Sequence, residues 1–469
     1  MKLTAKDIAQ IAHKEFRNAG LLKGKRLNGV STDTRTLREG NLFVALRGEQ
    51  MDGHRFLADA FARGAFAAVV EAGAETTSVA SRPLLVVDNS VRALGMLARL
   101  HRDRFAIPVI AVAGSNGKTT TKDMIAAVLS TRYTVLSTEG NHNNHIGVPL
   151  TLLRLTRKHA IAVVEIGTNH PGELAWLCEI LGPTHGIVTA IGREHLEFFG
   201  SVEGVAREEG TLYAVLRRTK KGAAFVHADD PQIVDLARGI KRRVTYGFAA
   251  RKAGIRGRDL HLEANGCARF LLSGPRMKKP VEIRLSIPGE HTAVNALAAA
   301  SVGIAFRIPA KEIRRVLEQV RPSSKRMEVV DLEGVVIFND TYNANPDSML
   351  ASLRTLAATH VKGKRIAVLA DMRELGAAGP EEHARIGRAV RDLGIDYLLT
   401  YGPLARQIHD AAGLPLAVHY DQKNVLAEYL TELIAPGDAV LVKGSRGMKM
   451  EDVVAFLEER LRSAVVPFG

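Results

Sequence analysis

The sequence predicts an α/β fold with a mainly parallel central sheet, and two observations support that prediction. Residues 109–121 form an apolar run, a glycine-rich loop and the start of a helical pattern. Short apolar runs then alternate with helical patterns through the centre of the chain, and again after residue 325. Such alternation favours a parallel sheet with helices on both faces. We expect a small N-terminal α/β domain before this centre and a Rossmann-like domain after it.

The composition is that of a globular protein with more than one domain. The 469 residues are too many for one hydrophobic core, and 46% of them are apolar while 24% are charged. No apolar run approaches the ~20 residues of a membrane-spanning helix, so no membrane insertion is expected. The start of the chain lacks the apolar centre of a signal peptide. The two cysteines, Cys178 and Cys267, fit free thiols in a reducing cytoplasm.

The formal net charge of +14 at pH 7 has two interpretations. It could serve nucleic acid binding. However, the densest basic groups, within 217–221 and 241–243, have no aromatic residues interleaved. We therefore expect a solvated basic surface that serves small anionic substrates, and no nucleic acid partner.

The first 88 residues carry helix and strand patterns of their own. Helical spacing relates Ile8, Ala9, Ile11 and Ala12. Apolar runs predict strands at 42–46, 67–70 and 83–87. A hydroxyl, a carboxylate and a guanidinium come close together before the first of these strands, on Ser31, Asp33 and Arg35. Such a group can hydrogen-bond a polar ring and a phosphate, although taken alone a loop or helix cap explains it better.

The glycine loop lies between a predicted strand at 109–113 and a predicted helix, after a helical pattern at 89–104. It consists of Gly114, Ser115, Asn116, Gly117, Lys118, Thr119 and Thr120. Glycines let backbone N–H groups approach a phosphate, Lys118 can reach the β/γ-phosphates, and the Thr119 hydroxyl can bind Mg²⁺. The general pattern GxxxxGK[ST] has its first glycine at 112, where this chain has Val112. The flanking strand and helix nevertheless favour nucleotide binding over an ordinary turn.

Polar residues follow three more predicted strands, at the sheet edge where ligands of parallel sheets bind. After 133–136 come Asn141, Asn143 and Asn144. After 161–164 comes Glu165, a natural Mg²⁺ ligand unless it is a surface glutamate at a strand end. After 186–190 comes His195, which is either a metal ligand, an active-site polar group or an ordinary loop residue.

A second strand–helix alternation follows an alanine-rich helix and a basic amphipathic helix within 281–320. Strands are predicted at 335–338, 365–370, 396–400 and 439–442. The motif GxGxxG is absent, so nothing indicates a dinucleotide. We place the domain boundaries at 1–88, 89–320 and 321–469.

Several motifs together resemble the Mur ligases, the ATP-dependent amide-bond ligases of peptidoglycan precursor synthesis. These are AGSNGKTTTK at 113–122, GNHNNHIGVPLTLL at 140–153, Glu165-Ile-Gly, His195, and NDTYNANPDSM at 339–349. The resemblance covers nearly the whole chain and implies a three-domain architecture that uses ATP and Mg²⁺. The last motif most resembles the family member that joins D-alanyl-D-alanine to UDP-N-acetylmuramoyl-tripeptide. A monomer is expected.

The resemblance also implies roles for individual residues. Catalysis would depend on Lys118, His195 and Arg326, and Mg²⁺ would be bound by Thr119, Glu165, His195 and Glu209. ATP would contact the glycine loop, His291, Asn295, Arg326, Asp340 and Tyr342. The peptide substrates would contact Ser31, Asp33, Arg35, Asn141, Asn143, Asn144, Asn343, Asn345, Ser348, Lys443 and Arg446. Near the adenine, Thr292 stands where the family more often has asparagine.

Glu209 departs from the family pattern. Relatives usually have a lysine there that CO₂ modifies and that binds a second Mg²⁺; a glutamate keeps a carboxylate but reaches less far. Either Glu209 binds metal through a water, or the backbone lies closer, or the second site is rebuilt. Glu208 points about 100° away around the helix and is a poor substitute.

The resemblance implies that ATP phosphorylates the tripeptide carboxylate and that the amine of the dipeptide then attacks the acyl phosphate. Two alternatives stay open. One is another ligase of the superfamily, such as a folylpolyglutamate synthase, against which STDTR at 31–35 and the motif at 339–348 argue. The other is a nucleic-acid-dependent P-loop ATPase, which the basic charge suggests.

Overall fold

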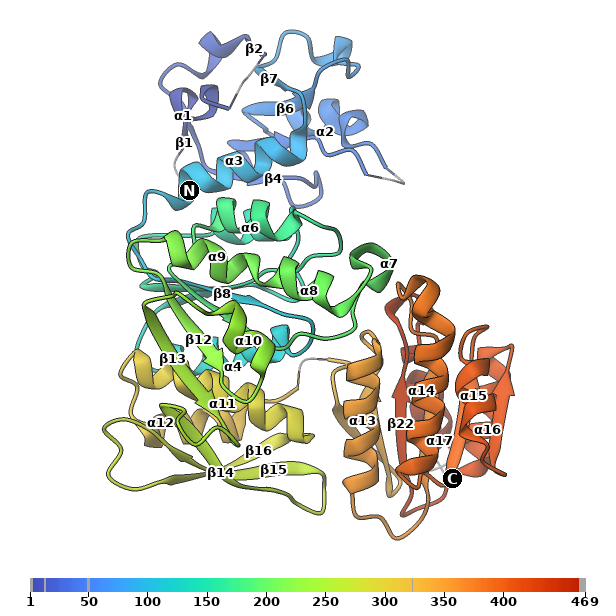
Figure 1. Ribbon diagram of the computed structural model, residues 1–469. Coiled ribbons are helices and arrows are strands. Elements are labelled where there is room, and N and C mark those ends of the chain that lie inside the picture. Colours follow the sequence, from blue (N-terminus) through green and yellow to red (C-terminus); the bar gives the residue numbers. More distant parts are fainter. Residues whose placement is uncertain (1–2, 12–13, 49–50, 323, 464–469) are drawn as a thin grey trace, which may run out of the picture. The chain divides into compact units, whose positions relative to one another are not determined.

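The computed structural model describes residues 3–11, 14–48, 51–322 and 324–463; Ala12 of the predicted N-terminal helix lies outside them. The chain divides into two compact units (Figure 1). The first comprises Met1–Ala111, Tyr133–Thr168 and Gly172–Gly186, and the second Val112–Arg132, Asn169–Pro171 and Ile187–Gly469. The predicted boundaries at 88 and 320 stay predictions.

A five-stranded sheet in the first unit has the order β2-β7-β6-β5-β4. Its strands are β2 (Glu15–Arg17), β4 (Gly29–Ser31), β5 (Asn41–Val44), β6 (Ala67–Glu71) and β7 (Leu84–Val87). All neighbours are parallel except β2 and β7. The three strands predicted here are confirmed as β5, β6 and β7. They are continuously apolar because both faces of a parallel strand are buried.

Short elements surround this sheet. They are β1 (Leu3–Thr4), antiparallel to β3 (Arg26–Leu27), α1 (Ala5–Ala9), α2 (Leu57–Ala62), and the 3₁₀ turns η1 (Ala19–Leu22), η2 (Gly53–Phe56) and η3 (Thr77–Val79). Helix α3 (Ser90–Arg102) begins where the Asn89 side chain accepts the N–H of Arg92, which confirms the helix expected at 89–104. It packs against α5 (Gly147–Leu153) and α6 (Glu173–Leu181).

The central sheet has nine strands in the order β16-β15-β14-β13-β12-β11-β8-β10-β9. They are β8 (Val109–Ala113), β9 (Val135–Ser137), β10 (Ile161–Glu165), β11 (His185–Val188), β12 (Ala223–His227), β13 (Arg242–Gly247), β14 (Ile255–Leu262), β15 (Cys267–Ser273) and β16 (Val281–Pro288). The pairs β9–β10, β12–β13 and β13–β14 are parallel, whereas β14, β15 and β16 are antiparallel.

That antiparallel edge was not predicted. Residues 281–288 form a strand, whereas only helices were expected between 281 and 320. Its half-exposed strands carry polar and charged residues between apolar ones, so they lack the continuous apolar run of a buried strand.

Helices of the second unit pack around the predicted glycine-loop helix, α4 (Lys118–Ser130). The alanine-rich helix α11 (Glu290–Ala305) and the basic helix α12 (Ala310–Gln319) both contact α4, as their sequence patterns allow. At Gly303 a Cβ atom would lie 2.7 Å from Val128 Cγ1, so only glycine permits this close approach. The remaining helices of this region are α7 (Leu196–Phe199), α8 (Val202–Glu209), α9 (Thr211–Arg218) and α10 (Pro231–Leu236).

A six-stranded C-terminal sheet has the order β17-β18-β22-β19-β20-β21. Its strands are β17 (Glu328–Leu332), β18 (Val335–Asp340), β19 (Arg365–Ala370), β20 (Tyr397–Tyr401), β21 (Ala417–Tyr420) and β22 (Ala439–Lys443). Only β17 is antiparallel to its neighbour. The four predicted strands are therefore confirmed as β18, β19, β20 and β22.

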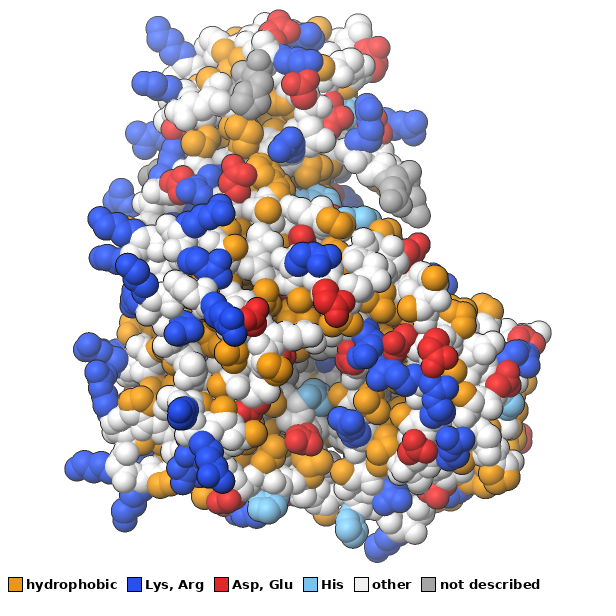
Figure 2. All heavy atoms as spheres, in the orientation of Figure 1, with side chains coloured by type: hydrophobic (Ala, Val, Ile, Leu, Met, Phe, Trp, Pro, Cys, Tyr) orange, Lys and Arg blue, Asp and Glu red, His pale blue; other side chains and the backbone are white. Residues whose placement is uncertain are grey.

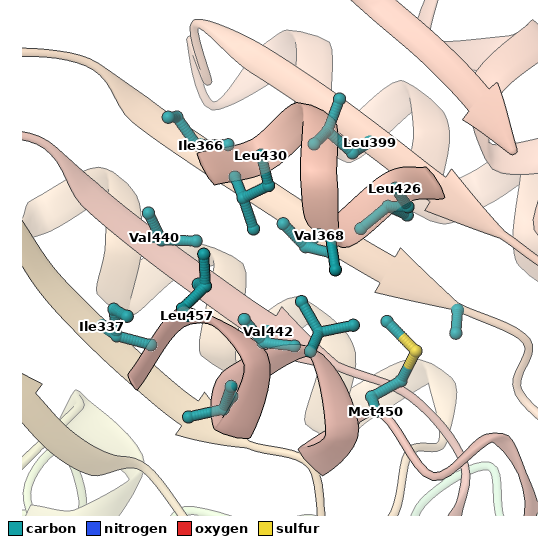
Figure 3. Close-up of a cluster of buried hydrophobic side chains, with 14 of the residues drawn as sticks. Ile337, Ile366, Val368, Leu399, Leu426, Leu430, Val440, Val442, Met450 and Leu457 are labelled. Carbon is teal, nitrogen blue, oxygen red and sulfur yellow. The ribbon is translucent and has the colours of Figure 1, made fainter. Parts of the chain in front are cut away.

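Helices cover this C-terminal sheet. They are α13 (Pro346–Ala358), α14 (Gly379–Asp392), α15 (Arg406–Ala412), α16 (Lys423–Leu433) and α17 (Glu451–Ser463), with 3₁₀ turns η4 (Gly376–Ala378) and η5 (Arg446–Met448). Leucines of α16 and α17 pack onto valines and isoleucines of the strands in a continuous apolar layer (Figure 3). Burial of this layer holds the strand ends and their polar loops in fixed positions.

Charged side chains are scattered over the visible surface among apolar and uncharged polar groups, with more Lys and Arg than Asp and Glu (Figure 2). All the lysines and arginines within 217–221 and 241–243 are exposed, and Thr219 between them is half-buried. Within 3–463, apart from the few residues left undescribed, no helix is both long enough and apolar enough to cross a bilayer.

Candidate active site

The glycine loop has the predicted strand–loop–helix arrangement. Strand β8 is fully buried, and α4 starts at Lys118. Gly114 and Gly117 have φ angles of 116° and 78°, which side-chain-bearing residues rarely adopt. A Cβ atom would lie 2.5 Å from Thr189 Oγ1 at Gly114, and 2.6 Å from Asn295 Oδ1 at Gly117. Both positions therefore require glycine for conformation and for space.

Hydrogen bonds tie this loop to the segment that follows β11. The Ser115 N–H donates to the Ala190 carbonyl at 2.8 Å, and the Ser115 hydroxyl accepts the Gly192 N–H at 2.9 Å. The Thr189 hydroxyl donates to the Asn116 carbonyl at 2.6 Å. Thr189 was missed by sequence reasoning, although a hydroxyl at a strand end is a usable signal.

Lys118 is held close to the loop by an acid. Its Nζ donates to the Gly114 carbonyl and lies 3.5 Å from Glu194 Oε2. Both side chains are largely buried, so the carboxylate offsets the cost of burying the ammonium. The α4 N-terminus adds backbone N–H groups, which makes this a favourable place for a phosphate. Glu194 was not predicted; its place directly before His195 was the available signal.

Glu209 lies against the glycine loop. Its side chain is fully buried at the end of α8, and Oε2 accepts the Gly114 N–H at 2.7 Å. Burial raises the pKa of Glu209 to about 8, and the nearby Lys118 charge partly opposes that shift. Oε1 has no hydrogen-bond partner. The structure thus brings Glu209 to the nucleotide loop, and its role as a metal ligand stays a prediction.

His195 contacts an acid from the C-terminal sheet region. Its Nδ1 lies 2.5 Å from Glu374 Oε2, without a well-directed hydrogen bond, and its Nε2 lies 3.9 Å from Glu194 Oε2. The Glu374 carbonyl accepts the Glu197 N–H at 3.1 Å. The interaction with His195 lowers the pKa of Glu374. Sequence reasoning missed Glu374, because nothing in its surroundings links it to a histidine so distant in the chain.

Two residues that were predicted to bind substrate form hydrogen bonds that stabilise the start of α13. Asn345 caps α13 by accepting the Ser348 N–H at 2.8 Å, and the Ser348 hydroxyl accepts the Asn345 N–H at 3.0 Å. This reciprocal pair is a capping box. The Asn345 amide also exchanges hydrogen bonds of 3.0 and 3.3 Å with the Asn116 amide of the glycine loop.

Arg193 makes a second link between the same regions. Its N–H donates to Asp347 Oδ2 at 2.6 Å and its guanidinium to Asp347 Oδ1 at 3.1 Å. The guanidinium also lies 3.1 Å from Glu382 Oε1. Gly192 lies so close that a Cβ atom would be 2.7 Å from Asp347 Oδ2. Neither Arg193 nor Asp347 was predicted as a site residue.

Asp340 and Lys443 form an ion pair at the ends of β18 and β22. Lys443 Nζ lies 2.5 Å from Asp340 Oδ2, which also accepts the Ser352 hydroxyl at 2.7 Å. Burial alone would raise the pKa of Asp340, but the Lys443 charge and these hydrogen bonds hold it below the ordinary value. Lys443 also donates to the Asn343 carbonyl at 3.0 Å, so its ammonium is largely committed within the protein.

Two arginines flank one aromatic ring beside this pair. The guanidinium carbons of Arg326 and Arg446 lie 3.9 and 5.5 Å from the centre of the Tyr342 ring. The Arg446 N–H donates to Asn343 Oδ1 at 3.2 Å. These cation–π contacts gather two positive charges next to predicted ATP and substrate residues.

The α11 N-terminus lies close enough to Asp340 and Lys443 for His291 to interact with their charges. Burial lowers the pKa of His291, with the Asp340 charge opposing and the Lys443 charge reinforcing that shift. Asn295 packs beneath Gly117. The Thr292 hydroxyl donates to the carbonyls of Ile287 and Gly289 at 3.0 and 2.6 Å. The hydroxyl hydrogen of Thr292 is therefore committed to backbone carbonyls of the protein.

In the first unit, Glu165 ends β10 with its side chain almost fully buried. Asn143 Nδ2 donates to Glu165 Oε1 at 2.8 Å, while Oε2 has no partner. Asn144 Oδ1 instead accepts the N–H groups of Ile146 and Gly147, so this side chain holds the turn that leads into α5. Asn141 is exposed. The structure thus brings Asn143, but not the Asn144 side chain, to Glu165.

Ser31, Asp33 and Arg35 do come together after β4. The Ser31 hydroxyl donates to the Asp33 carbonyl at 2.8 Å, and Arg35 Nη2 donates to Asp33 Oδ2 at 2.7 Å. The Arg35 hydrogen bond lowers the pKa of Asp33 to about 2. The Arg35 side chain is 86% exposed, so its guanidinium has room for an anion as well.

Oxygen donors suitable for Mg²⁺ are present in both units. The buried Thr119 Oγ1 and Glu165 Oε2 atoms have no hydrogen-bond partner. Among the described residues no three His, Cys, Asp or Glu side chains converge on one point. Mg²⁺ needs no such cage, because it is commonly held by one or two protein oxygens together with waters and phosphates. The donors therefore fit this ion.

The fold and the glycine loop define a nucleotide-binding α/β protein with a second, Rossmann-like sheet. Three family descriptions match the chain: "Mur ligase family, catalytic domain" at 26–102, "Mur ligase middle domain" at 112–303 and "Mur ligase, glutamate ligase domain" at 325–446. The chain belongs to the Mur ligase family. This confirms the predicted family and its three-domain α/β architecture.

Individual relatives match over nearly the full length. The chain is 36% identical over 464 residues to the UDP-N-acetylmuramoyl-tripeptide–D-alanyl-D-alanine ligase of Escherichia coli K12, covering 98% of this chain and 99% of that protein. A crystal structure of MurF from Acinetobacter baumannii has 30% identity and a TM-score of 0.89, covering 98% and 99%. MurF ligase from Thermotoga maritima in complex with ADP has 27% identity and a TM-score of 0.82, covering 93% and 98%.

Proposed function

We propose that this chain is an ATP-dependent ligase that joins D-alanyl-D-alanine to UDP-N-acetylmuramoyl-tripeptide in peptidoglycan precursor synthesis. The observation that carries the proposal is the glycine loop with its buried Lys118–Glu194 pair, in a chain similar end to end to ligases of that name. The same similarity favours this function over a folylpolyglutamate synthase or a nucleic-acid-dependent ATPase. A cytoplasmic location and a monomeric state stay predictions.

The chemistry requires activation of an acid. A carboxylate oxygen of the tripeptide attacks the γ-phosphorus of ATP, the bond to the β,γ-bridging oxygen breaks, and an acyl phosphate and ADP form. The dipeptide amine then attacks the acyl carbon, a tetrahedral intermediate forms, and phosphate leaves with its bridging oxygen. The free pKa of such an amine is ~8, so it needs only modest help to lose its proton.

Residues of this chain would overcome the repulsion between a carboxylate and a triphosphate. Lys118 places a positive charge at the loop, and the N–H groups at the start of α4 supply partial positive charge. Arg326, stacked on Tyr342, adds a further charge near Asp340. Positioning of the reactants alone can contribute up to ~7–11 kcal/mol.

Mg²⁺ would be held by Thr119 and Glu165, with His195 and Glu209 as further candidates, and it would neutralise charge on the phosphate oxygens. Asn143 orients Glu165 through its 2.8 Å hydrogen bond. Ser31, Asp33 and Arg35 would receive the uridine diphosphate.

The dipeptide side of the site would involve the loop after β18. Asn343 is exposed and fixed by the Arg446 N–H. Since Lys443 is committed to Asp340, Arg446 is the better placed of the two cations for a substrate carboxylate. Asn345 and Ser348 would act by shaping this loop through their cap.

A substrate panel tests the proposal. Purified protein is incubated with ATP, Mg²⁺ and either UDP-muramoyl peptides with D-alanyl-D-alanine or folates with glutamate, and the products are identified by mass. We expect the UDP-pentapeptide and equimolar phosphate from the first mixture only. Ligation of folate, or phosphate release that depends on DNA or RNA, would contradict it.

A further inference from the structure

Glu374 lies in a loop that the C-terminal sheet region holds firmly. The Met372 N–H donates to Nε2 of the buried His383 at 2.9 Å, and the Arg373 N–H donates to the Ser445 hydroxyl at 2.8 Å. His383 in turn contacts the Gly379 carbonyl through Nδ1 at 2.6 Å. Because Nε2 of His383 accepts an N–H, it carries no proton, and burial lowers the pKa of this histidine, which favours the same neutral form. The backbone around Glu374 is thereby fixed.

The loop that carries Glu374 also contacts the backbone of the segment that carries His195. The Glu374 carbonyl accepts the Glu197 N–H at 3.1 Å, and a Cβ atom on Gly376 would lie 3.1 Å from Glu197 Cα. Glu374 and His195 both have left-handed backbones, with φ of 64° and 47°. Such conformations are costly for residues with side chains, and they persist where surrounding contacts impose them.

The contact between the two side chains has a chemical consequence. At 2.5 Å, Nδ1 of His195 and Oε2 of Glu374 cannot both present lone pairs, so one of the two atoms carries a proton. An N–H on Nδ1 does not point directly at Oε2, so the contact is a short ion-pair distance rather than a well-aligned hydrogen bond. With the proton on Nδ1, the lone pair of a neutral imidazole is on Nε2, which lies on the side of Glu194 and hence of Lys118.

We propose that Glu374 is a positioning residue that holds His195 in the Nδ1–H form and so leaves Nε2 free to accept. A histidine that binds a metal ordinarily donates its other ring N–H to a carboxylate in this way. The inference rests on the proposed function and deepens it: the C-terminal sheet region supplies the carboxylate that prepares a histidine of the nucleotide region.

Imidazole ¹⁵N shifts of the full chain test this without any ligand. With ¹⁵N-histidine and His195→Gln to assign the signal, wild type at a pH where imidazole is neutral should show His195 protonated at Nδ1. Glu374→Ala should move the proton to Nε2 or give a mixture, while Glu374→Gln, which keeps an acceptor oxygen, should move it less. The matched control is Glu381→Ala, which removes a 77% exposed carboxylate paired with Arg388, and it should leave the His195 shifts unchanged. Unchanged shifts in Glu374→Ala, or a wild-type signal from the Nε2–H form, would overturn the proposal.

Kinetics give a second readout. Loss of a carboxylate behind a metal-binding histidine costs about 10–100-fold in metal affinity or activity, so Glu374→Ala should lower kcat and raise the Mg²⁺ concentration needed for half-maximal rate. Glu374→Gln should recover part of both. A rise in KM for the peptide substrates with unchanged kcat and Mg²⁺ requirement would contradict the proposal. Should wild type fail to ligate at all, the proposed function fails while the ¹⁵N shifts still decide the role of Glu374.

Discussion

Single residues in this chain combine burial with charge at the places where chemistry is expected. Lys118 lies beside the buried Glu194 carboxylate, and the buried Glu209, whose pKa burial raises to about 8, accepts an N–H of the glycine loop. Buried charges are retained when partners compensate them, and they are then held with little freedom. The nucleotide loop is therefore preorganised before any phosphate arrives.

Gly117 offers a test of that preorganisation. Gly117→Ala forces a Cβ into a left-handed backbone and against Asn295, whereas Gly73→Ala has a similar φ of 82° but open space around it. Both should lose about 1–2 kcal/mol of unfolding free energy through backbone strain. Only Gly117→Ala should also weaken ADP binding, by about tenfold or more, a change of ~1.4 kcal/mol. Urea unfolding and calorimetric titration measure the two effects; equal ADP affinity in both variants would contradict this account.

The Asp340–Lys443 pair predicts a pH-dependent stability. The pKa of Asp340 is lowered in the folded protein, so its ionised form stabilises the fold above the ordinary Asp range. That contribution is lost as pH falls through the lowered folded pKa. Lys443→Met leaves the carboxylate unpaired and should cost about 3–5 kcal/mol at pH 7. The exposed Lys362→Met serves as control and should cost less than about 0.5 kcal/mol.

Unfolding in urea at pH 7 and at progressively lower pH measures this difference. The difference in unfolding free energy between wild type and Lys443→Met should narrow as pH falls from 7, because burial raises the pKa of an unpaired Asp340, which is therefore protonated at a higher pH than the carboxylate paired with Lys443. If the difference in unfolding free energy between wild type and Lys443→Met is the same at every pH, lost packing rather than the lost charge pair explains the destabilisation.

At the scale of elements, sequence patterns predicted the apolar strands well and the polar ones poorly. Strand β8 and strand β19 have the predicted bounds, because buried parallel strands are continuous apolar runs. Strands β14, β15 and β16 were missed, because half-exposed antiparallel strands mix charged and apolar residues.

The same contrast holds within the site. The loop Gly114–Thr120 could be predicted because its chemistry is local to one strand and one helix. Asp347 and Glu374 could not, because their partners are set by tertiary packing. Asn144, Asn345 and Ser348 show a related limit: asparagine and serine side chains hydrogen-bond nearby backbone N–H groups as readily as they bind ligands.

The cap of α13 separates those two roles. Asn345→Ala removes the cap and the amide pair with Asn116, while Asn89→Ala removes only the cap of α3. Each should cost about 1 kcal/mol of unfolding free energy. Asn345→Ala alone should also slow substrate-dependent phosphate release, by about tenfold if the amide pair holds the loop in place. Equal rates of phosphate release in both variants would show that Asn345 acts only as a helix cap.

At the scale of the whole molecule, charge and substrate are complementary. The proposed substrates, a nucleoside triphosphate and a UDP-peptide, are anionic. A net charge of +14 should therefore favour their encounter with the protein. The spread of Lys and Arg over the visible surface gives a diffuse field rather than one docking patch (Figure 2).

Added salt should therefore change KM for the charged substrates more than it changes kcat. Because salt shortens the Debye length from ~10 Å at 0.1 M to ~3 Å at 1 M, raising NaCl across that range should increase KM for the UDP-tripeptide several-fold. The effect on kcat should be smaller, since the buried Lys118–Glu194 pair is screened little. Steady-state kinetics at fixed Mg²⁺ check this; a fall in kcat at constant KM would contradict it.

The central claim is that a phosphoryl group passes from the nucleotide at the Lys118 loop to the peptide acid. The most direct measurement uses UDP-tripeptide with both oxygens of the reacting carboxylate labelled with ¹⁸O and analyses the released phosphate by mass. One ¹⁸O should appear in each phosphate formed with the wild-type protein, while Lys118→Ala should form almost no labelled phosphate. Unlabelled phosphate accompanying ligation, or undiminished label with Lys118→Ala, would contradict the account.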